Sequence, residues 1–134
     1  EADVFCATVG QLRGRDLLPV LDLETPFTDL DEEELVAWVK AWLARVENRL
    51  GSPPIIYTNN SSWQATGDTT AFALAGHPLW VANFDVPSPL VPADNWAGKG
   101  WSIWQYTSSG HVRGIEGSVD KNRLARGFGR IKVR

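Results

Sequence analysis

The chain has 134 residues and a formal net charge of −3, with 43% hydrophobic and 22% charged residues. These proportions are typical of one globular domain and exclude a disordered or fibrous chain. No apolar run reaches the roughly 20 residues that cross a bilayer, so no membrane partner is expected. The single cysteine, Cys6, excludes an internal disulfide.

The charge is unevenly distributed along the chain. Residues 1–120 contain seven Lys and Arg and all 16 acidic residues, whereas residues 121–134 contain six basic residues and no acid. The basic end indicates either a solvated terminus or contact with an anionic polymer such as a cell-wall polymer. Because the rest of the chain is acidic, we do not expect nucleic acid as a partner.

The first predicted elements are a helix, a strand and a longer helix. Residues 2–9 read as the end of a helix that Gly10 stops, and residues 18–23 as a buried strand. Asp31 and Glu34 have the spacing of a capping box, and apolar residues then recur at helical spacing. This pattern predicts a helix over residues 32–50, with Trp38 and Trp42 in the core.

The second half of the chain continues the alternation and then departs from it. Residues 55–58 and 79–82 are predicted strands, with a short helical patch between residues 61 and 75. Alternating strands and helices are typical of a parallel sheet. Beyond residue 85 a Pro-rich loop leads to a strand at 102–106, and a Gly-rich turn leads to a strand at Val119 and Asp120. No helix is predicted between these last strands, which hairpins or loops would join.

Asp22 and Glu24 lie at the end of the first predicted strand. Residues two apart on a strand face the same side, so the two carboxylates would emerge together. In (β/α) barrels the carboxyl ends of the strands carry the chemistry, and glycosidic bond cleavage uses a pair of carboxyl groups. Two close carboxylates also raise the pKa of one of them. The alternative is that both acids only cap a turn or pair with Arg.

Further polar and aromatic residues end other predicted strands. Tyr57 and Asn59 follow the second strand, and Asp120 follows the last one. Trp80 and Trp104 lie within strands, where indole rings can stack on the apolar faces of sugars. Several strand ends would thus direct polar groups to one edge of the sheet.

Other kinds of chemistry are not indicated. His77 and His111 have no Cys or acidic partners at the spacing of metal ligands. The sequence contains neither a Gly-x-Ser-x-Gly elbow nor a phosphate-binding loop. We therefore predict no metal and no cofactor.

Four segments together resemble the glycoside hydrolase family 25 muramidases, the lysozymes of the Chalaropsis type. They are Leu18–Glu24, Ile55–Asn59, Leu79–Ala82 and the segment from Trp104-Gln105-Tyr106 to Val119-Asp120-Lys121-Asn122. The last segment is the most specific, because its two motifs occur in order and at the family's spacing. The resemblance covers residues 2 to about 125.

The resemblance implies a fold, an activity and roles for residues. The fold would be an irregular (β/α) barrel of eight strands with fewer than eight helices. The activity would be hydrolysis of the β-1,4 bond between N-acetylmuramic acid and N-acetylglucosamine in peptidoglycan glycan strands, without metal or cofactor. Glu24 would be the general acid, Asp22 would orient or stabilise the reacting sugar, and Asp120 would be the acid on the last strand. The substrate contacts would be Tyr57, Asn59, Trp80, Trp104 and Tyr106.

The sequence departs from the family at its beginning. The first strand of the family, with its Asp-x-Ser motif, and the two strands that follow are not found. The predicted fold is therefore α/β, the C-terminal portion of an irregular TIM-like barrel without the first three strands. Residues 1–125 would form a partial catalytic barrel and residues 126–134 a basic tail. We expect the chain to be part of a longer enzyme, or copies to self-associate and cover the open sheet edges.

These observations predict a peptidoglycan hydrolase that acts extracellularly or in the cell wall, or that a phage encodes; no signal peptide is visible. The alternative is a non-catalytic wall- or carbohydrate-binding module that uses the Trp-rich edge and the basic tail. A chitinase-like glycosidase would share the paired acids. It is less favoured, because Val20 stands where that family has a further Asp.

Overall fold

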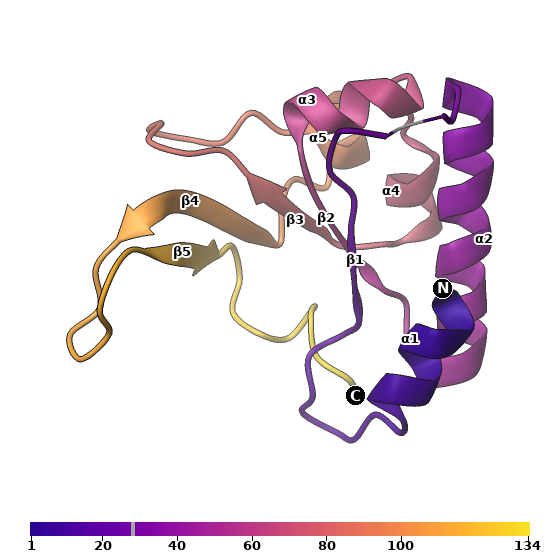
Figure 1. Ribbon diagram of the computed structural model, residues 1–134, viewed down its shortest axis with the longest axis horizontal. Coiled ribbons are helices and arrows are strands. Elements are labelled where there is room, and N and C mark those ends of the chain that lie inside the picture. The colour runs from indigo at the N-terminus through magenta and orange to yellow at the C-terminus, as the bar shows by residue number, and fades with distance from the viewer. Residues whose placement is uncertain (28) are drawn as a thin grey trace.

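The computed structural model describes residues 1–27 and 29–134. Its centre is a five-stranded sheet in the order β1-β2-β3-β4-β5. The strands are β1 (Val20–Asp22), β2 (Ile55–Asn59), β3 (Leu79–Ala82), β4 (Ile103–Gly110) and β5 (Val119–Leu124). The first four are parallel, and β5 runs antiparallel to β4. The predicted α/β class is confirmed, with helices gathered on one face of the sheet (Figure 1).

Helix α2 (Glu32–Leu50) has the bounds that the sequence predicts. The Asp31 carboxylate accepts a hydrogen bond from the Glu34 amide at 2.9 Å, and the Glu34 carboxylate accepts one from the Asp31 amide at 3.1 Å. This capping box satisfies two of the amides that a helix start leaves without partners. The apolar stripe of α2 packs against the sheet, with Trp42 only 8% exposed, but Trp38 is 36% exposed and lies outside the core.

Helix α1 (Ala2–Val9) packs along the C-terminal half of α2. The rings of Phe5 and Trp42 lie 5.2 Å apart between centroids, and Arg45 forms an ion pair with Asp3 at 2.7 Å. The sequence predicts helix over these residues and its end at Gly10. The first two helices therefore form one layer over the start of the sheet.

The connection from β2 to β3 consists of three short helical pieces in place of one patch. These are α3 (Asn60–Trp63), the 3-10 turn η1 (Gln64–Thr66) and α4 (Ala71–Ala75). The break falls at Gly67, whose φ of 66° is in the left-handed region. A Cβ at this position would collide with the Glu32 carboxylate at the start of α2. The left-handed backbone favours glycine here, whereas the exposed Glu32 side chain can turn away from an added Cβ.

The Pro-rich segment after residue 85 contains a short helix, α5 (Pro92–Ala97), where the sequence predicted only a loop. From Ala93 to Trp96 its φ values lie between 50° and 56°, so the turn is left-handed. Such a turn costs L-residues roughly 1–2 kcal/mol each. Two hydrogen bonds hold this turn in place. The Ala93 amide donates to the Asp68 carboxylate at 2.7 Å, and the Trp96 indole donates to the His77 carbonyl at 2.8 Å. Ala93 and Trp96 are also buried.

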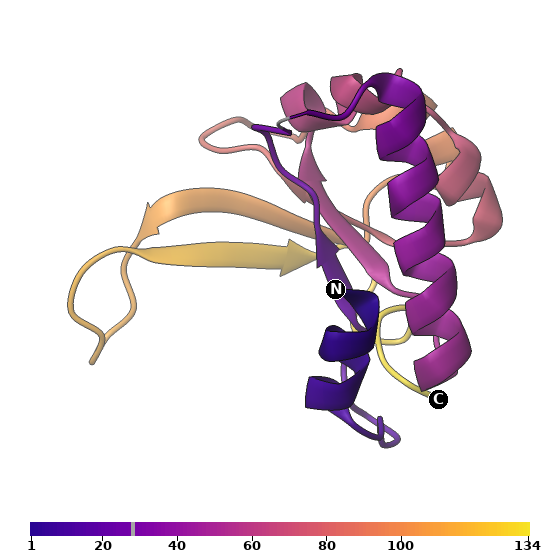
Figure 2. The same ribbon diagram turned by 45° about the vertical axis from the view of Figure 1, so that its right-hand side comes forward.

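The last two strands form a hairpin that projects away from the helices (Figure 2). After β5 the chain returns beneath the sheet, where the Leu18 amide donates to the Ile131 carbonyl at 2.9 Å. Ile131 is 1% exposed and packs in a second, smaller core with Leu18, Ile55 and Ile103. Part of the segment after residue 125 therefore packs against the sheet, although the sequence predicted a basic tail there. None of the helices in the described ranges is both long and apolar enough to cross a membrane.

Candidate active site

The carboxyl ends of β1, β2 and β3 bring three predicted site residues into one row. The strand register pairs Asp22 with Tyr57 and Tyr57 with Trp80. All three lie on the face of the sheet away from the helices, because their neighbours Leu21, Ile56 and Val81 are in the helix-side core. The rings of Tyr57 and Trp80 meet edge to face with centroids 5.2 Å apart.

Glu24 lies two residues beyond Asp22, where hydrogen bonds fix the backbone on both sides of it. The Leu23 carbonyl accepts from the Thr58 hydroxyl at 2.8 Å, and the Thr25 amide donates to the Ser62 hydroxyl at 3.0 Å. The Asn59 side chain donates to the Glu24 carboxylate at 3.3 Å. Strand β2 and helix α3 together therefore position this carboxyl group.

Burial and the neighbouring Asp22 raise the pKa of Glu24 above its ordinary value. Partial burial of the carboxyl group contributes most, and repulsion from the Asp22 carboxylate adds to it. The hydrogen bond from Asn59 acts in the opposite direction, because it stabilises the carboxylate. The net result is a carboxyl group that keeps its proton to a higher pH than an isolated glutamate.

Tyr57 lies at the centre of the carboxylates. Burial raises the pKa of its phenol to about 12, and the charges of Glu24, Asp22 and Asp120 contribute to this rise. Its hydroxyl donates to the Gln105 side-chain oxygen at 2.9 Å, and the Gln105 amide donates to Asp120 at 3.5 Å. Asp120 on β5 is therefore connected to Tyr57 on β2 through one side chain of β4.

Gln105 is the site residue that the sequence analysis did not single out. Its side chain is 6% exposed and contacts both a phenol and a carboxylate of the site. The sequence pattern could have indicated this residue. Gln105 is a polar residue between two aromatic residues on a strand, and alternate residues of a strand face opposite sides. Its neighbours Trp104 and Tyr106 must therefore face away from the carboxylates.

Trp104 and Tyr106 lie on the helix side of the sheet or beside it. Trp104 is 4% exposed within the main core, and its indole donates to the Asn83 carbonyl at 2.8 Å. The Arg123 guanidinium lies 5.4 Å from the centre of the Trp104 ring and 4.6 Å from that of Tyr106. The structure thus separates these two aromatic residues from Asp22, Glu24 and Tyr57, with which the sequence analysis grouped them.

Asn59 and Trp80 complete the row of polar groups. The Asn59 side-chain oxygen accepts a hydrogen bond from the Ser62 amide at 2.8 Å, so this residue also caps α3. The Trp80 indole donates to the Asn122 side chain at 2.8 Å, which ties β3 to β5. Residues 1–27 and 29–134 contain no group of three His, Cys, Asp or Glu residues that could hold a metal ion.

A cluster of carboxylates at the carboxyl ends of parallel strands, one with a raised pKa, is the arrangement that glycoside hydrolases use. The sequence matches the family described as "Glycosyl hydrolases family 25" over residues 1–115. The chain belongs to this family.

Two curated relatives and one solved structure are similar to the chain. Lysozyme M1 from Streptomyces globisporus is 33% identical over 132 residues, which cover 92% of the chain and 44% of that protein. The N,O-diacetylmuramidase of Chalaropsis sp. is 34% identical over 140 residues, 95% of the chain and 65% of that protein. The crystal structure of the bacterial lysozyme from Streptomyces coelicolor superposes with a TM-score of 0.84 at 32% identity, over 97% of the chain and 62% of that structure. The chain thus spans about half to two thirds of the length of these proteins.

Proposed function

We propose that the chain acts as a muramidase that hydrolyses the β-1,4 bond between N-acetylmuramic acid and N-acetylglucosamine in peptidoglycan. The observation that carries this proposal is the Glu24 carboxyl group, whose pKa is raised beside the Asp22 charge on the helix-free face of the sheet. Membership of glycosyl hydrolase family 25 and the names of the lysozyme relatives support the same substrate.

The proposed mechanism assigns different roles to the two carboxyl groups of β1. Protonated Glu24 donates its proton to the glycosidic oxygen, and the bond from this oxygen to the anomeric carbon breaks. Positive charge then develops on the sugar ring. The Asp22 carboxylate stabilises this charge or orients the acetamido group of the substrate, whose oxygen can attack the anomeric carbon. Water then adds to the anomeric carbon and gives a proton to the Glu24 carboxylate, which completes the hydrolysis and restores the acid. Partial burial of Glu24 and, after it, repulsion from the Asp22 carboxylate raise the pKa of Glu24 and so favour its protonated form.

Asp120 and Tyr57 are proposed to act on the same sugar. Gln105 supports this, because it accepts a hydrogen bond from Tyr57 and donates one to Asp120. We therefore propose Gln105 as a positioning residue that fixes the distance between the Tyr57 hydroxyl and the Asp120 carboxylate. The proposed substrate contacts are Tyr57, Asn59 and Trp80, and the position of Trp104 and Tyr106 on the other side of the sheet argues against these two.

The sheet is proposed to be the C-terminal portion of an irregular (β/α) barrel. Both outer strands support this, because β1 pairs only with β2 and β5 only with β4 among the described residues. Residues 1–125 would be the catalytic part, with residues 126–134 as a basic C-terminal segment. Second copies of the chain, or strands of a longer enzyme, would cover the free edges. The enzyme would act outside the cell or in the cell wall, or be encoded by a phage.

Release of reducing sugar from purified peptidoglycan tests the proposed activity. We expect the chain to release it and Glu24→Gln to lower the rate by about 10³-fold, because the amide has no proton to donate. Glu47→Gln, an equal change on the exposed surface of α2, should leave the rate unchanged.

Two other outcomes would decide against this assignment. Equal rates for Glu24→Gln and the unmodified chain would show that Glu24 is not the acid. Sedimentation of the chain with peptidoglycan, without release of reducing sugar, would favour the alternative of a non-catalytic wall-binding module.

A further inference from the structure

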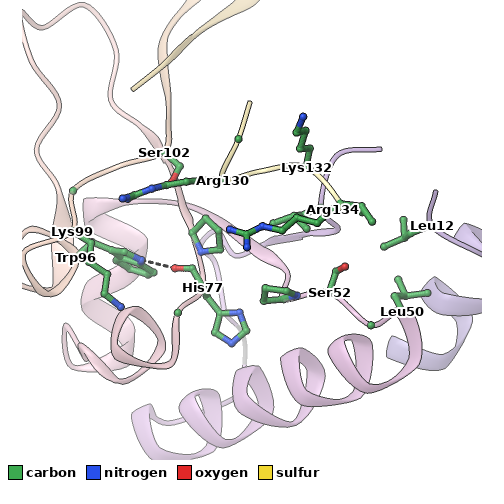
Figure 3. Close-up of a pocket in the computed structure, with 18 residues that line it drawn as sticks. Leu12, Leu50, Ser52, His77, Trp96, Lys99, Ser102, Arg130, Lys132 and Arg134 are labelled. Atoms are coloured by element: carbon green, nitrogen blue, oxygen red, sulfur yellow. Dashed lines mark hydrogen bonds between the residues drawn. The ribbon is translucent and has the colours of Figure 1, made fainter. Parts of the chain in front are cut away.

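A basic pocket lies at the end of the sheet where the parallel strands begin, opposite to the end that carries the carboxylates (Figure 3). It has a volume of about 580 Å³. Residues that directly precede β2, β3 and β4 form one wall, among them Ser52, His77 and Ser102. The chain from Gly129 to Arg134 forms the other wall. Because parallel strands begin at this edge and end at the other, the length of the strands separates the pocket from Asp22 and Glu24.

The charged side chains that line the pocket are all basic. Lys99, Arg130, Lys132 and Arg134 line it, and no acidic residue does. A second, smaller hollow shares Lys99, Ser102 and Arg130 and adds Arg126. Within residues 1–27 and 29–134 the one ion pair joins Asp3 and Arg45, so none of these five cations has a carboxylate partner there.

Of the four basic side chains of the pocket, Arg130 and Arg134 are placed to meet an anion, whereas the Lys99 ammonium donates a hydrogen bond to the Ala73 carbonyl. In Figure 3 the Arg134 side chain extends across the cavity above Ser52 and His77, and the Arg130 guanidinium lies near Ser102, whereas the Lys132 ammonium points away. His77 is 7% exposed, and its Nδ1–H donates to the Pro54 carbonyl at 3.0 Å. The imidazole is thereby held in one orientation beneath the guanidinium groups.

Size and exposure together indicate what kind of anion the pocket takes. The cavity is far larger than one phosphate ion, and its basic side chains are exposed. An exposed ion pair contributes little on its own, so a ligand with a single charge would be held weakly. A ligand whose charges repeat along a chain can contact both hollows at once, and guanidinium groups match the geometry of phosphate oxygens.

We propose that this basic pocket binds a phosphodiester polymer without nucleobases, of the poly(glycerol phosphate) type, with successive phosphate groups near Arg134, Arg130 and Arg126. The site is separate from the carboxylate cluster, and the proposal does not depend on the proposed function. A chain bound in this way would stay on a phosphate-rich surface while the edge with Glu24 remained free.

Binding of poly(glycerol phosphate), measured by isothermal titration calorimetry, tests this proposal. We expect binding that weakens as the salt concentration rises. The double variant R130E/R134E should weaken it by about ten-fold or more, because two contacts become repulsive. The double variant K40E/R113E changes the net charge by the same amount at exposed positions that do not line either hollow, and it should bind as the unmodified chain does.

Three further arms separate the possible ligands and sites. Inorganic phosphate at the same total phosphate concentration should bind at least about ten-fold more weakly than the polymer, since it makes fewer contacts. Glu24→Gln should bind the polymer with unchanged affinity, even if the proposed activity fails. An equal loss in both double variants, no binding of the polymer, or tighter binding of a single-stranded oligonucleotide of equal charge would overturn the proposal.

Discussion

At the scale of single residues, Tyr57 reports the electrostatics of the whole carboxylate cluster. Its phenol has a pKa of about 12 because it is partly buried and because Glu24, Asp22 and Asp120 surround it. The chain has two tyrosines, so in a Tyr106→Phe background the absorbance of tyrosinate reports Tyr57 alone. We expect ionisation well above the ordinary tyrosine range, and Asp120→Asn should lower this pKa, because it removes a negative charge that opposes tyrosinate.

The control for this titration is Asp94→Asn, which removes an exposed carboxylate on α5 that does not affect the pKa of Tyr57. It should leave the titration curve in place, with circular dichroism confirming that the fold persists over the pH range. A Tyr57 that ionises at the ordinary value, or that responds equally to both substitutions, would contradict the described cluster.

At the scale of secondary structure elements, Asn59 connects the end of β2 to the site. Its oxygen caps α3 and its amide donates to Glu24. Asn59→Asp keeps the cap but replaces the donor by a negative charge, so the pKa of Glu24 should rise further. We expect the carboxyl resonance of Glu24 in ¹³C NMR to titrate at higher pH. Because protonated Glu24 is the proposed acid, the decline of activity with rising pH should shift in the same direction.

Asn59→Ala separates the two roles of this residue. It removes the cap as well as the hydrogen bond, so it should lower the free energy of unfolding by about 1 kcal/mol in urea denaturation, whereas Asn59→Asp should not. An unchanged Glu24 titration in both variants would mean that Asn59 does not influence the acid.

Alternation along β4 decided which side chains belong to the site. Strand residues face opposite sides in turn, so the position of Gln105 between Tyr57 and Asp120 directs Trp104 and Tyr106 to the other side. Residue type alone therefore does not place an aromatic side chain of β4 at the site. The same rule correctly placed Asp22 and Glu24 on one face.

At the scale of the whole molecule, the last nine residues contribute to stability. Ile131 is 1% exposed and packs with Leu18, Ile55 and Ile103 from three separate parts of the chain. Ile131→Ala should therefore lower the free energy of unfolding by about 2–4 kcal/mol, measured by urea denaturation. Phe128→Ala changes a neighbour that is 58% exposed and should cost less than about 0.5 kcal/mol. Equal effects would place the segment outside the packed structure.

The outer strands of the sheet make a second prediction at this scale. β1 and β5 each have one strand partner among the described residues, and a free strand edge is a template for further pairing. If copies of the chain pair through these edges, as proposed, size-exclusion chromatography with light scattering should give the mass of a dimer. A stable, well-folded monomer would contradict self-association and leave strands of a longer enzyme as the remaining partner.

The elements that depend on local signals can be predicted from the sequence alone. The capping box at Asp31 and Glu34 and the helical spacing after it predicted α2 with its observed bounds. The spacing of Asp22 and Glu24 placed two carboxylates together, because the period of a strand is a local property. The family was likewise readable from short motifs in order along the chain.

Only the tertiary structure decided which distant residues meet. The contacts of Gln105 with Tyr57 and Asp120 depend on the register of three strands, and no local pattern carries that register. The left-handed turn of α5 is unfavourable in isolation and depends on the burial of Ala93 and Trp96. The basic pocket exists because the chain after β5 returns to the edge where the parallel strands begin, which brings Arg130 and Arg134 beside His77.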